Sequence, residues 1–440
     1  MSLKEHFRKT IQLAIPLVIG QLGHMALGVV DNLMIGQLGP VFLAAASLAN
    51  AIFVQFMILG LGLTFALSAL VAAANRPGNE EECSSLLHHS FAINMVASVL
   101  LLVVMEAAIG LLPYLGQEER IINLTAPYLR IIAISIIPML FFQTYRQFSD
   151  GLTFVKPAMY IMLLANVVNV FLNWALIFGN LGFPRLELNG AGISTLGNRI
   201  FAGVAMFLYV IFNSKFKKFN PRYFRFKYHK ELILKILRIG IPSSLQAFLE
   251  VFAFTGVAFI IGWIGAYELA AHQIALTLAA VTFMFALGIS QASAIRVGIE
   301  FGKDQKRETL KAGFSAILLA ILVMGVNGLI FVVFRHELVG FFVDDFSVRE
   351  IAARLLIIAA IFQIFDGIQA VGVGVLRGIQ DVKIPTFIVF IAYWILSIPI
   401  GYFLGITWDY SVDGVWAGFV SGLASAAVML SWRFWKKTRE

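Results

Sequence analysis

Charge and cysteine are scarce in this sequence. Only 13% of its 440 residues are charged, and one residue, Cys83, is a cysteine. A single cysteine excludes a disulfide within the chain and a metal site built from several cysteines. The motifs HExxH and GxSxG, the phosphate-binding loop and the GxGD motif of aspartyl proteases are also absent. These absences argue against an enzyme and against direct use of ATP.

Hydrophobic residues, in contrast, make up 60% of the chain, and its mean hydropathy is +0.86. Such a composition is typical of an integral membrane protein, in which a helix needs about 20 mostly apolar residues to cross the bilayer. We therefore predict an all-α membrane protein with twelve transmembrane helices. The predicted spans are residues 11–36, 43–73, 87–112, 121–145, 158–181, 190–212, 236–262, 269–298, 312–334, 351–376, 384–405 and 414–432.

The basic residues predict the orientation of these spans. With the N-terminus inside, every lysine falls in or beside a cytosolic segment. The outer loops keep scattered arginines such as Arg120, Arg185, Arg335 and Arg349, each near an acid. This positive-inside bias predicts that both termini are cytosolic. The net charge of +8 then reflects topology and lipid contact, and we expect no nucleic-acid partner.

An internal duplication divides the chain. Ile15-Pro16 is repeated as Ile241-Pro242, and Gly62 matches Gly288 at the same offset along the sequence. Each half holds six spans, so both halves have the same orientation and a pseudo-two-fold axis runs along the membrane normal. We predict an N-terminal six-helix lobe at 1–212, a basic cytosolic linker at 213–235 and a C-terminal six-helix lobe at 236–440.

Three acids, Asp31, Glu250 and Asp366, lie inside the predicted spans. An acid near the middle of a membrane costs about 2.5–3.5 kcal/mol on insertion scales, so such residues usually have a function. From helix rise, we place Glu250 about 18 Å and Asp366 about 16 Å from the cytosolic edge. Two acids on different helices of one lobe can share a cation or a proton. The alternative is a structural carboxylate bonded to neighbouring helices, which is our reading of Glu106 near an outer helix end.

Amides accompany these acids. Asn166, Asn169 and Asn173 are spaced by three and four residues, which places them on one helical face. They can line a polar path or hold membrane helices together, and the sequence leaves both open. Gln363 and Gln369 flank Asp366 at three residues on either side and share its face.

The chain resembles the multidrug and toxic compound extrusion (MATE) family, and within it the NorM branch. The resemblance rests on MALGVVDNLMIG around Asp31, LQAFLEVF around Glu250 and AAHQIAL at 270–276. It continues in IRVGIEFG at 295–302, FQIFDGIQAVGVGVLRGIQD at 362–381 and AYWILSIPIGYFLG at 392–405, so it covers nearly the whole chain.

This resemblance implies two six-helix bundles and export of organic cations, dyes and drugs in exchange for sodium or protons. Glu250 and Asp366 resemble the cation-site acids of the branch, with a possible Na⁺ held between them, and Asp31 resembles the acid of the first helix. Asn169 and Asn173 match asparagines of the fifth helix. Phe362 departs from the family, since some relatives carry an ion-binding tyrosine there.

We therefore expect a cation-coupled antiporter that works by alternating access. Glu250, Asp366 and Asp31 are the predicted coupling residues. The predicted substrate cavity comprises Asp31, Asn169, Asn173, Gln363, Gln369 and Phe362. We expect no cofactor, a monomer in the bacterial inner membrane, and as partners cationic amphiphilic molecules, lipids and either Na⁺ or H⁺. The alternative is a lipid-linked oligosaccharide flippase of related fold, for which we would expect basic residues at mid-membrane.

Overall fold

A computed structural model of the chain describes residues 1–219 and 229–439, and over these residues its regular structure is helical. Twelve helical segments in this part are long and apolar enough to cross a membrane. Each coincides with one of the twelve predicted spans, and most extend a few residues beyond it. The prediction of an all-α fold with twelve spans is therefore confirmed.

The described part of the N-terminal half consists of seven long helices and three short 3₁₀ turns. The helices are α1 (Leu3–Gly36), α2 (Pro40–Ala74), α3 (Glu80–Gly110), α4 (Glu119–Ile134), α5 (Ile136–Gly151), α6 (Lys156–Phe178) and α7 (Glu187–Phe212). The turns are η1 (Leu112–Leu115), η2 (Asn180–Gly182) and η3 (Ser214–Phe219). Helices α4 and α5 form one span, interrupted at Ser135.

The C-terminal half repeats this order of six spans, but its fourth span is one continuous helix and its fifth is divided. Its helices are α8 (Lys230–Ile264), α9 (Ala266–Gly302), α10 (Lys306–Val333), α11 (Arg335–Gly340), α12 (Phe346–Gly378), α13 (Lys383–Phe390), α14 (Ile398–Tyr402) and α15 (Ser411–Arg439). The fifth span combines α13 and α14 with two π-helical segments, η4 (Ile391–Ser397) and η5 (Phe403–Thr407). Such π-helical turns are rare and often mark functional positions.

Contacts divide the chain into two compact units. Unit 1 consists of Met1–Gln21 and Leu245–Glu440, and unit 2 of Leu22–Ser244. Each boundary lies within a long helix, α1 or α8, because the first turns of these helices pack with the other half of the chain. The lobes predicted at 1–212 and 236–440 follow the duplicated halves of the sequence, and they stay a prediction. Residues 220–228 of the predicted linker, 213–235, lie outside the described residues.

Two glycines at equivalent positions of the repeat allow the beginnings of α1 and α8 to pack closely against helices of the other half of the chain. A Cβ atom added to Gly62 of α2 would lie 2.8 Å from the backbone nitrogen of Ser244 on α8. A Cβ atom added to Gly288 of α9 would lie 2.8 Å from the backbone nitrogen of Val18 on α1. Val18 and Ser244 are separated along the chain by the same offset as the two glycines. The same backbone-to-backbone contact is therefore built once in each unit, which matches the duplication read from the sequence.

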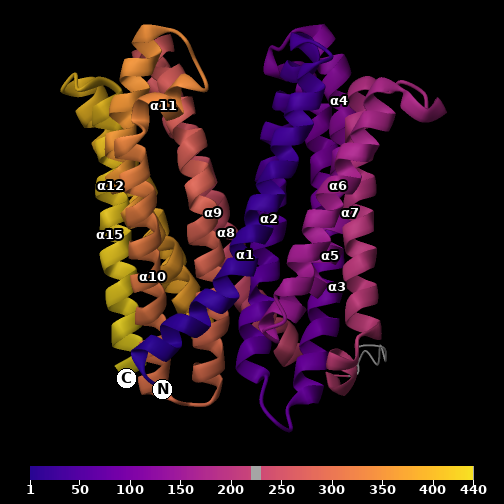
Figure 1. Ribbon diagram of the computed structural model, residues 1–440, viewed down its shortest axis with the longest axis vertical. Coiled ribbons are helices and arrows are strands. Elements are labelled where there is room, and N and C mark those ends of the chain that lie inside the picture. The colour runs from indigo at the N-terminus through magenta and orange to yellow at the C-terminus, as the bar shows by residue number, and fades with distance from the viewer. Residues whose placement is uncertain (220–228, 440) are drawn as a thin grey trace. The chain divides into compact units, whose positions relative to one another are not determined.

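Each unit has its own apolar core. In unit 2 the buried residues come from α1 to α7 and include Ile35, Phe53, Leu129 and Leu140. In unit 1, α12 packs against α9, α10 and α15, and Figure 1 shows α12, α10 and α15 running alongside one another. These long, closely packed helices hold the buried polar side chains described next.

Candidate functional site

Glu250 lies on α8 of unit 1 and has a hydrogen-bond partner on the fifth span of that half. The Tyr393 hydroxyl donates to its Oε1 atom at 3.4 Å. Tyr393 is 1% exposed and belongs to the π-helical segment η4. The wider turn of a π-helix changes which side chains face the neighbouring helix. A phenol oxygen therefore lies beside the carboxylate, although Phe362 offers no hydroxyl.

Asp366 lies on α12 in the interior of unit 1 and is 4% exposed. Its Oδ1 atom is buried and has no hydrogen-bond partner among the described residues. The carboxylates of Asp366 and Glu250 are close enough to repel each other electrostatically. A buried pair of like charges with an unsatisfied oxygen is unfavourable by itself, and a bound cation or a proton would relieve it. The structure thus brings the two predicted acids together.

The predicted glutamines lie on the same helix as Asp366. Gln363 and Gln369 are each 1% exposed and lie on α12 on either side of Asp366. The Gln369 amide lies close enough to the Glu250 carboxylate to interact with it. Neither this amide nor the amide of Gln363 makes a hydrogen bond of standard geometry with the described residues. Amide and carboxylate oxygens are the ligand type that a hard cation prefers.

Phe362 of α12 belongs to a cluster of aromatic rings. Its ring centroid lies 5.5 Å from that of Trp416, 6.1 Å from that of Phe419 and 6.3 Å from that of Phe254. Phe254 and Phe419 are stacked at 4.9 Å. With Phe362 only 2% exposed, the cluster packs α12 against α8 and α15. Its contacts are those of a packing residue.

Asp31 lies on α1 in unit 2 and accepts hydrogen bonds at both oxygens. Asn173 Nδ2 of α6 donates to Oδ1 at 2.6 Å, and Thr195 Oγ1 of α7 donates to Oδ2 at 3.2 Å. Asn173 also donates to Asn169 Oδ1 at 3.2 Å, and Asn169 donates to Ser194 Oγ at 3.4 Å. The two asparagines are fully buried. The structure therefore joins three helices of unit 2 through the predicted acid and its amides.

Arginines also lie inside the units, and the sequence reading overlooked them because it considered only acids. Arg146 of α5 is 4% exposed and pairs with Asp150 at 3.4 Å. Arg199 of α7 is attracted electrostatically to Asp31. Arg377 of α12, 7% exposed, is attracted to Glu250. Each of these three arginines thus has an acidic partner.

Other acids and polar groups have structural partners. Glu106 lies 3.2 Å from Arg130 Nε, with both side chains well exposed, in agreement with a structural role. His272 Nδ1 accepts a hydrogen bond from Trp416 Nε1 at 3.1 Å. Among the described residues, no group of three or more His, Cys, Asp or Glu side chains is arranged to hold a metal ion. The Glu250–Asp366 pair contains two such side chains and falls outside that criterion.

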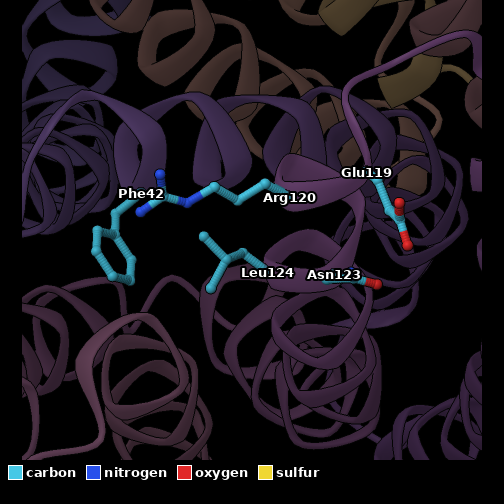
Figure 2. A pocket seen from close by; sticks show the side chains of 5 residues that line it. All are labelled: Phe42, Glu119, Arg120, Asn123 and Leu124. Atoms are coloured by element: carbon cyan, nitrogen blue, oxygen red, sulfur yellow. The ribbon is translucent and has the colours of Figure 1, made fainter.

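A separate pocket of about 440 Å³ lies in unit 2, at the beginnings of α2 and α4. It is lined by Phe42, Glu119, Arg120, Asn123 and Leu124. Figure 2 shows the Arg120 side chain extending toward the Phe42 ring. None of the predicted site residues lines this pocket.

Besides the arginines above, sequence reasoning missed the hydrogen-bonding residues Tyr393, Ser194 and Thr195. Tyr393 lies inside the AYWILSIP stretch, which was noted as a motif without a role for its tyrosine. Thr195 and Arg199 lie one helical turn apart on α7, and Ser194 precedes Thr195, but this spacing gives no indication of the partner helix.

Comparison with known families gives matches in both halves of the chain. The family model MatE matches residues 16–175 and 242–403. The starts of the two matched ranges, Pro16 and Pro242, are equivalent positions of the internal repeat.

Named relatives match over almost their whole length. The probable multidrug resistance protein NorM of Rhizobium meliloti (strain 1021) is 34% identical, over 99% of this chain and 94% of the relative. The multidrug resistance protein NorM of Vibrio cholerae serotype O1 is 30% identical, over 98% of this chain and 96% of the relative.

Among solved structures, an outward-facing multidrug resistance MATE family transporter of the MOP superfamily superposes with a TM-score of 0.90. It is 20% identical and covers 99% of this chain and 96% of its own. At that identity the likeness concerns the fold, and it confirms the predicted fold class.

Proposed function

Since this chain belongs to the MatE family, we propose that it is a multidrug efflux transporter that exports organic cations in exchange for sodium ions or protons. Its relatives at 30–34% identity are named multidrug resistance proteins. The proposal places the chain in the bacterial inner membrane with both termini in the cytosol, in keeping with the positive-inside distribution of its lysines.

The observation that carries the proposed coupling is the acid pair of unit 1. Glu250 and Asp366 repel each other inside the unit, and one Asp366 oxygen has no partner among the described residues. Tyr393 and the amides of Gln363 and Gln369 supply neutral oxygen ligands nearby. This set suits a monovalent cation: a sodium ion bound between oxygens, or a proton shared by the two carboxylates.

The cycle that we propose is alternating access. The transporter loads its coupling cation at Glu250 and Asp366 from the outside and releases it to the cytosol as a cationic drug binds. A one-for-one exchange of monovalent cations moves no net charge, so the chemical gradient alone drives it. A tenfold cation gradient supplies about 1.4 kcal/mol, enough for tenfold accumulation of the drug outside.

The flippase alternative is not favoured. Basic residues do lie inside the units, but Arg146, Arg199 and Arg377 each interact with an acid and so offer little net positive charge to an anionic headgroup. The relatives named above are multidrug resistance proteins, which agrees with a cationic substrate.

Export of ethidium from bacterial cells that lack their own efflux pumps tests the function. We expect cells with the wild-type chain to lose ethidium fluorescence, and Glu250→Ala or Asp366→Ala to abolish export at unchanged expression. Glu106→Ala is the matched control, because this acid is paired with Arg130 on the exposed surface. Full export by either site variant would contradict the assignment of the coupling site.

A further inference from the structure

His6, near the beginning of α1, is a buried histidine in a segment that is otherwise open to water. It is 0% exposed, whereas the other residues of 1–9 are exposed or half-buried. The next buried residue is Thr10, whose hydroxyl donates to the His6 carbonyl oxygen at 3.0 Å. The segment therefore has little apolar packing of its own, and His6 makes its one set of polar contacts that is protected from water.

Two helices of unit 1 bind the His6 ring. Its Nε2 atom lies 2.9 Å from Glu308 Oε2 of α10, and its Nδ1 atom lies 3.1 Å from Arg296 Nη2 of α9. A guanidinium can only donate, so Nδ1 must accept. A carboxylate can only accept, so Nε2 must carry the hydrogen. The two contacts together require the neutral ring in one tautomer.

Glu308 is already paired with other cations. Its Oε1 atom lies 2.7 Å from Lys311 Nζ, and its Oε2 atom lies 2.8 Å from the amino nitrogen of Met1. Lys311 also donates to the Met1 carbonyl oxygen at 2.9 Å, so both cations are held beside this acid. A positive charge on His6 would therefore be a third cation around one carboxylate.

The other side of the imidazole faces a guanidinium. Arg296 lies 3.2 Å from Glu300, and Glu300 also lies 3.2 Å from Lys303, so this acid is shared by two cations as well. The remaining acid of the segment, Glu5, pairs with Lys9 at 3.6 Å. A proton on Nδ1 would replace the hydrogen bond from Arg296 by repulsion between two cations.

We propose that His6, Arg296 and Glu308 form an N-terminal latch that opens when the His6 ring takes up a proton from the cytosol. With the neutral ring, the beginning of α1 is bound to α9 and α10. Histidine is the side chain that changes charge between about pH 5 and 8. The protonated ring cannot accept from Arg296 and adds a cation where cations are already in excess, so the segment detaches.

The latch acts on a helix that serves both units. Residues of α1 up to Gln21 belong to unit 1, and those from Leu22 on belong to unit 2 and include Asp31. A closed latch ties the beginning of α1 to α9 and α10. An open latch removes these contacts, and α1 is then held to α9 farther along, where Val18 packs against Gly288. We expect slower export from an acidified cytosol, a consequence that rests on the proposed export function.

A spin label on Lys4→Cys measures whether the beginning of α1 is bound. Lys4 is exposed, and the single cysteine of the chain, Cys83, is 0% exposed, so the label attaches to the introduced cysteine. In purified protein in nanodiscs, we expect an immobile label at about pH 8. The mobile component should increase at least about threefold at about pH 5.5, because histidine is charged at the lower pH.

Two substitutions of His6 and one control separate its protonation from other effects of pH. His6→Gln offers a carbonyl oxygen to Arg296 and an amide hydrogen to Glu308 but takes up no proton, so the label should stay immobile at both pH values. His6→Lys places a permanent cation beside Arg296, so the label should be mobile at both. His336→Gln changes an exposed histidine of α11 and should leave the response to pH as in the wild type.

Transport of tetraphenylphosphonium by purified protein in liposomes measures the effect on export. Wild type and His6→Gln are compared under the same imposed gradient, with the cytosolic side of the protein at about pH 8 or about pH 5.5. We expect equal rates at the higher pH, and at the lower pH a wild type at least about threefold slower than His6→Gln, because only the wild-type latch opens there.

A wild-type label that stays immobile at both pH values would overturn the inference. A His6→Gln label that responds as the wild type does, or a His6→Lys label that is immobile at both, would overturn it as well. Equal export by wild type and His6→Gln at both pH values would overturn the regulation of export. A wild type that transports nothing under a sodium gradient or a pH gradient would instead refute the proposed function, while the label still measures the latch.

Discussion

Replacing Gly62 by alanine should destabilise unit 2, because the new methyl group has no room. It would meet the backbone of α8: the Ser244 nitrogen at 2.8 Å, the Ser243 carbonyl oxygen at 3.0 Å, and the Ser244 Cα atom closer still. Backbone atoms cannot move aside as the end of a side chain can, so α2 and α8 must separate. Overpacking of this kind costs about 1–3 kcal/mol.

Thermal unfolding of the detergent-purified protein, followed by tryptophan fluorescence, measures this cost. A loss of about 2 kcal/mol lowers the midpoint by about 4–8 °C for a unit of 150–250 residues. Gly28→Ala is the matched control, because nothing lies within 4 Å of the added methyl group. In a helix this change should stabilise by about 0.5–1 kcal/mol.

The duplication provides a second variant for the same measurement. Gly288→Ala should lower the midpoint in the same way, since its methyl group would meet the Val18 backbone at 2.8 Å and 2.9 Å. An unchanged midpoint for both glycine variants would refute the claim that α2 contacts α8, and α9 contacts α1, through backbone atoms. A fall in the midpoint of Gly28→Ala as large as theirs would refute it as well.

Two further substitutions test the polar interior. Tyr393→Phe removes the hydroxyl that donates to Glu250. One hydrogen bond contributes about 0.5–1.5 kcal/mol, so the change should weaken coupled tetraphenylphosphonium exchange in liposomes by about two- to twelvefold. Arg146→Met leaves Asp150 buried without its partner and should lower the unfolding midpoint by an amount equivalent to about 3–5 kcal/mol, measured by thermal unfolding.

Each of these has a control of the same chemistry. Tyr402→Phe changes a tyrosine that is 40% exposed and should leave exchange unchanged. Arg130→Met breaks the exposed pair with Glu106 and should cost about 0–1 kcal/mol. Exchange by Tyr393→Phe equal to that of Tyr402→Phe would show that the hydroxyl plays no part. A midpoint for Arg146→Met no lower than that for Arg130→Met would show that Asp150 tolerates the loss.

Sequence periodicity predicted the twelve spans because each apolar run exceeds the length that a membrane requires, and Gly, Pro and charges separate the runs. The motifs repeated along the sequence predicted the duplication. In the structure, the equivalent residues Gly62 and Gly288 make equivalent contacts. The sequence did not predict that the beginnings of α1 and α8 each pack with the other half of the chain. This packing depends on which neighbour a continuous helix packs against, and a helical pattern carries no such information.

The hydrogen-bond partners of the buried polar side chains were not predictable from the sequence either. Asn166 Nδ2 donates to the Gly23 carbonyl at 2.7 Å, and Trp394 Nε1 donates to the Leu249 carbonyl at 3.1 Å. Gly23 and Leu249 are equivalent positions of the internal repeat, so the bond is duplicated although its donors differ. Tyr393 escaped prediction because a π-helical turn shifts the register that ordinary helix spacing assumes.

In the transport cycle proposed above, Glu250 and Asp366 together hold the coupling cation. The decisive measurement is drug efflux by purified protein in liposomes, under an imposed sodium gradient and then under an imposed pH gradient, for wild type and for Asp366→Asn. We predict that at least one gradient drives efflux by the wild type and that the same gradient drives none in the variant. Equal gradient-driven efflux by both proteins would contradict the assignment of the cation to this pair of acids.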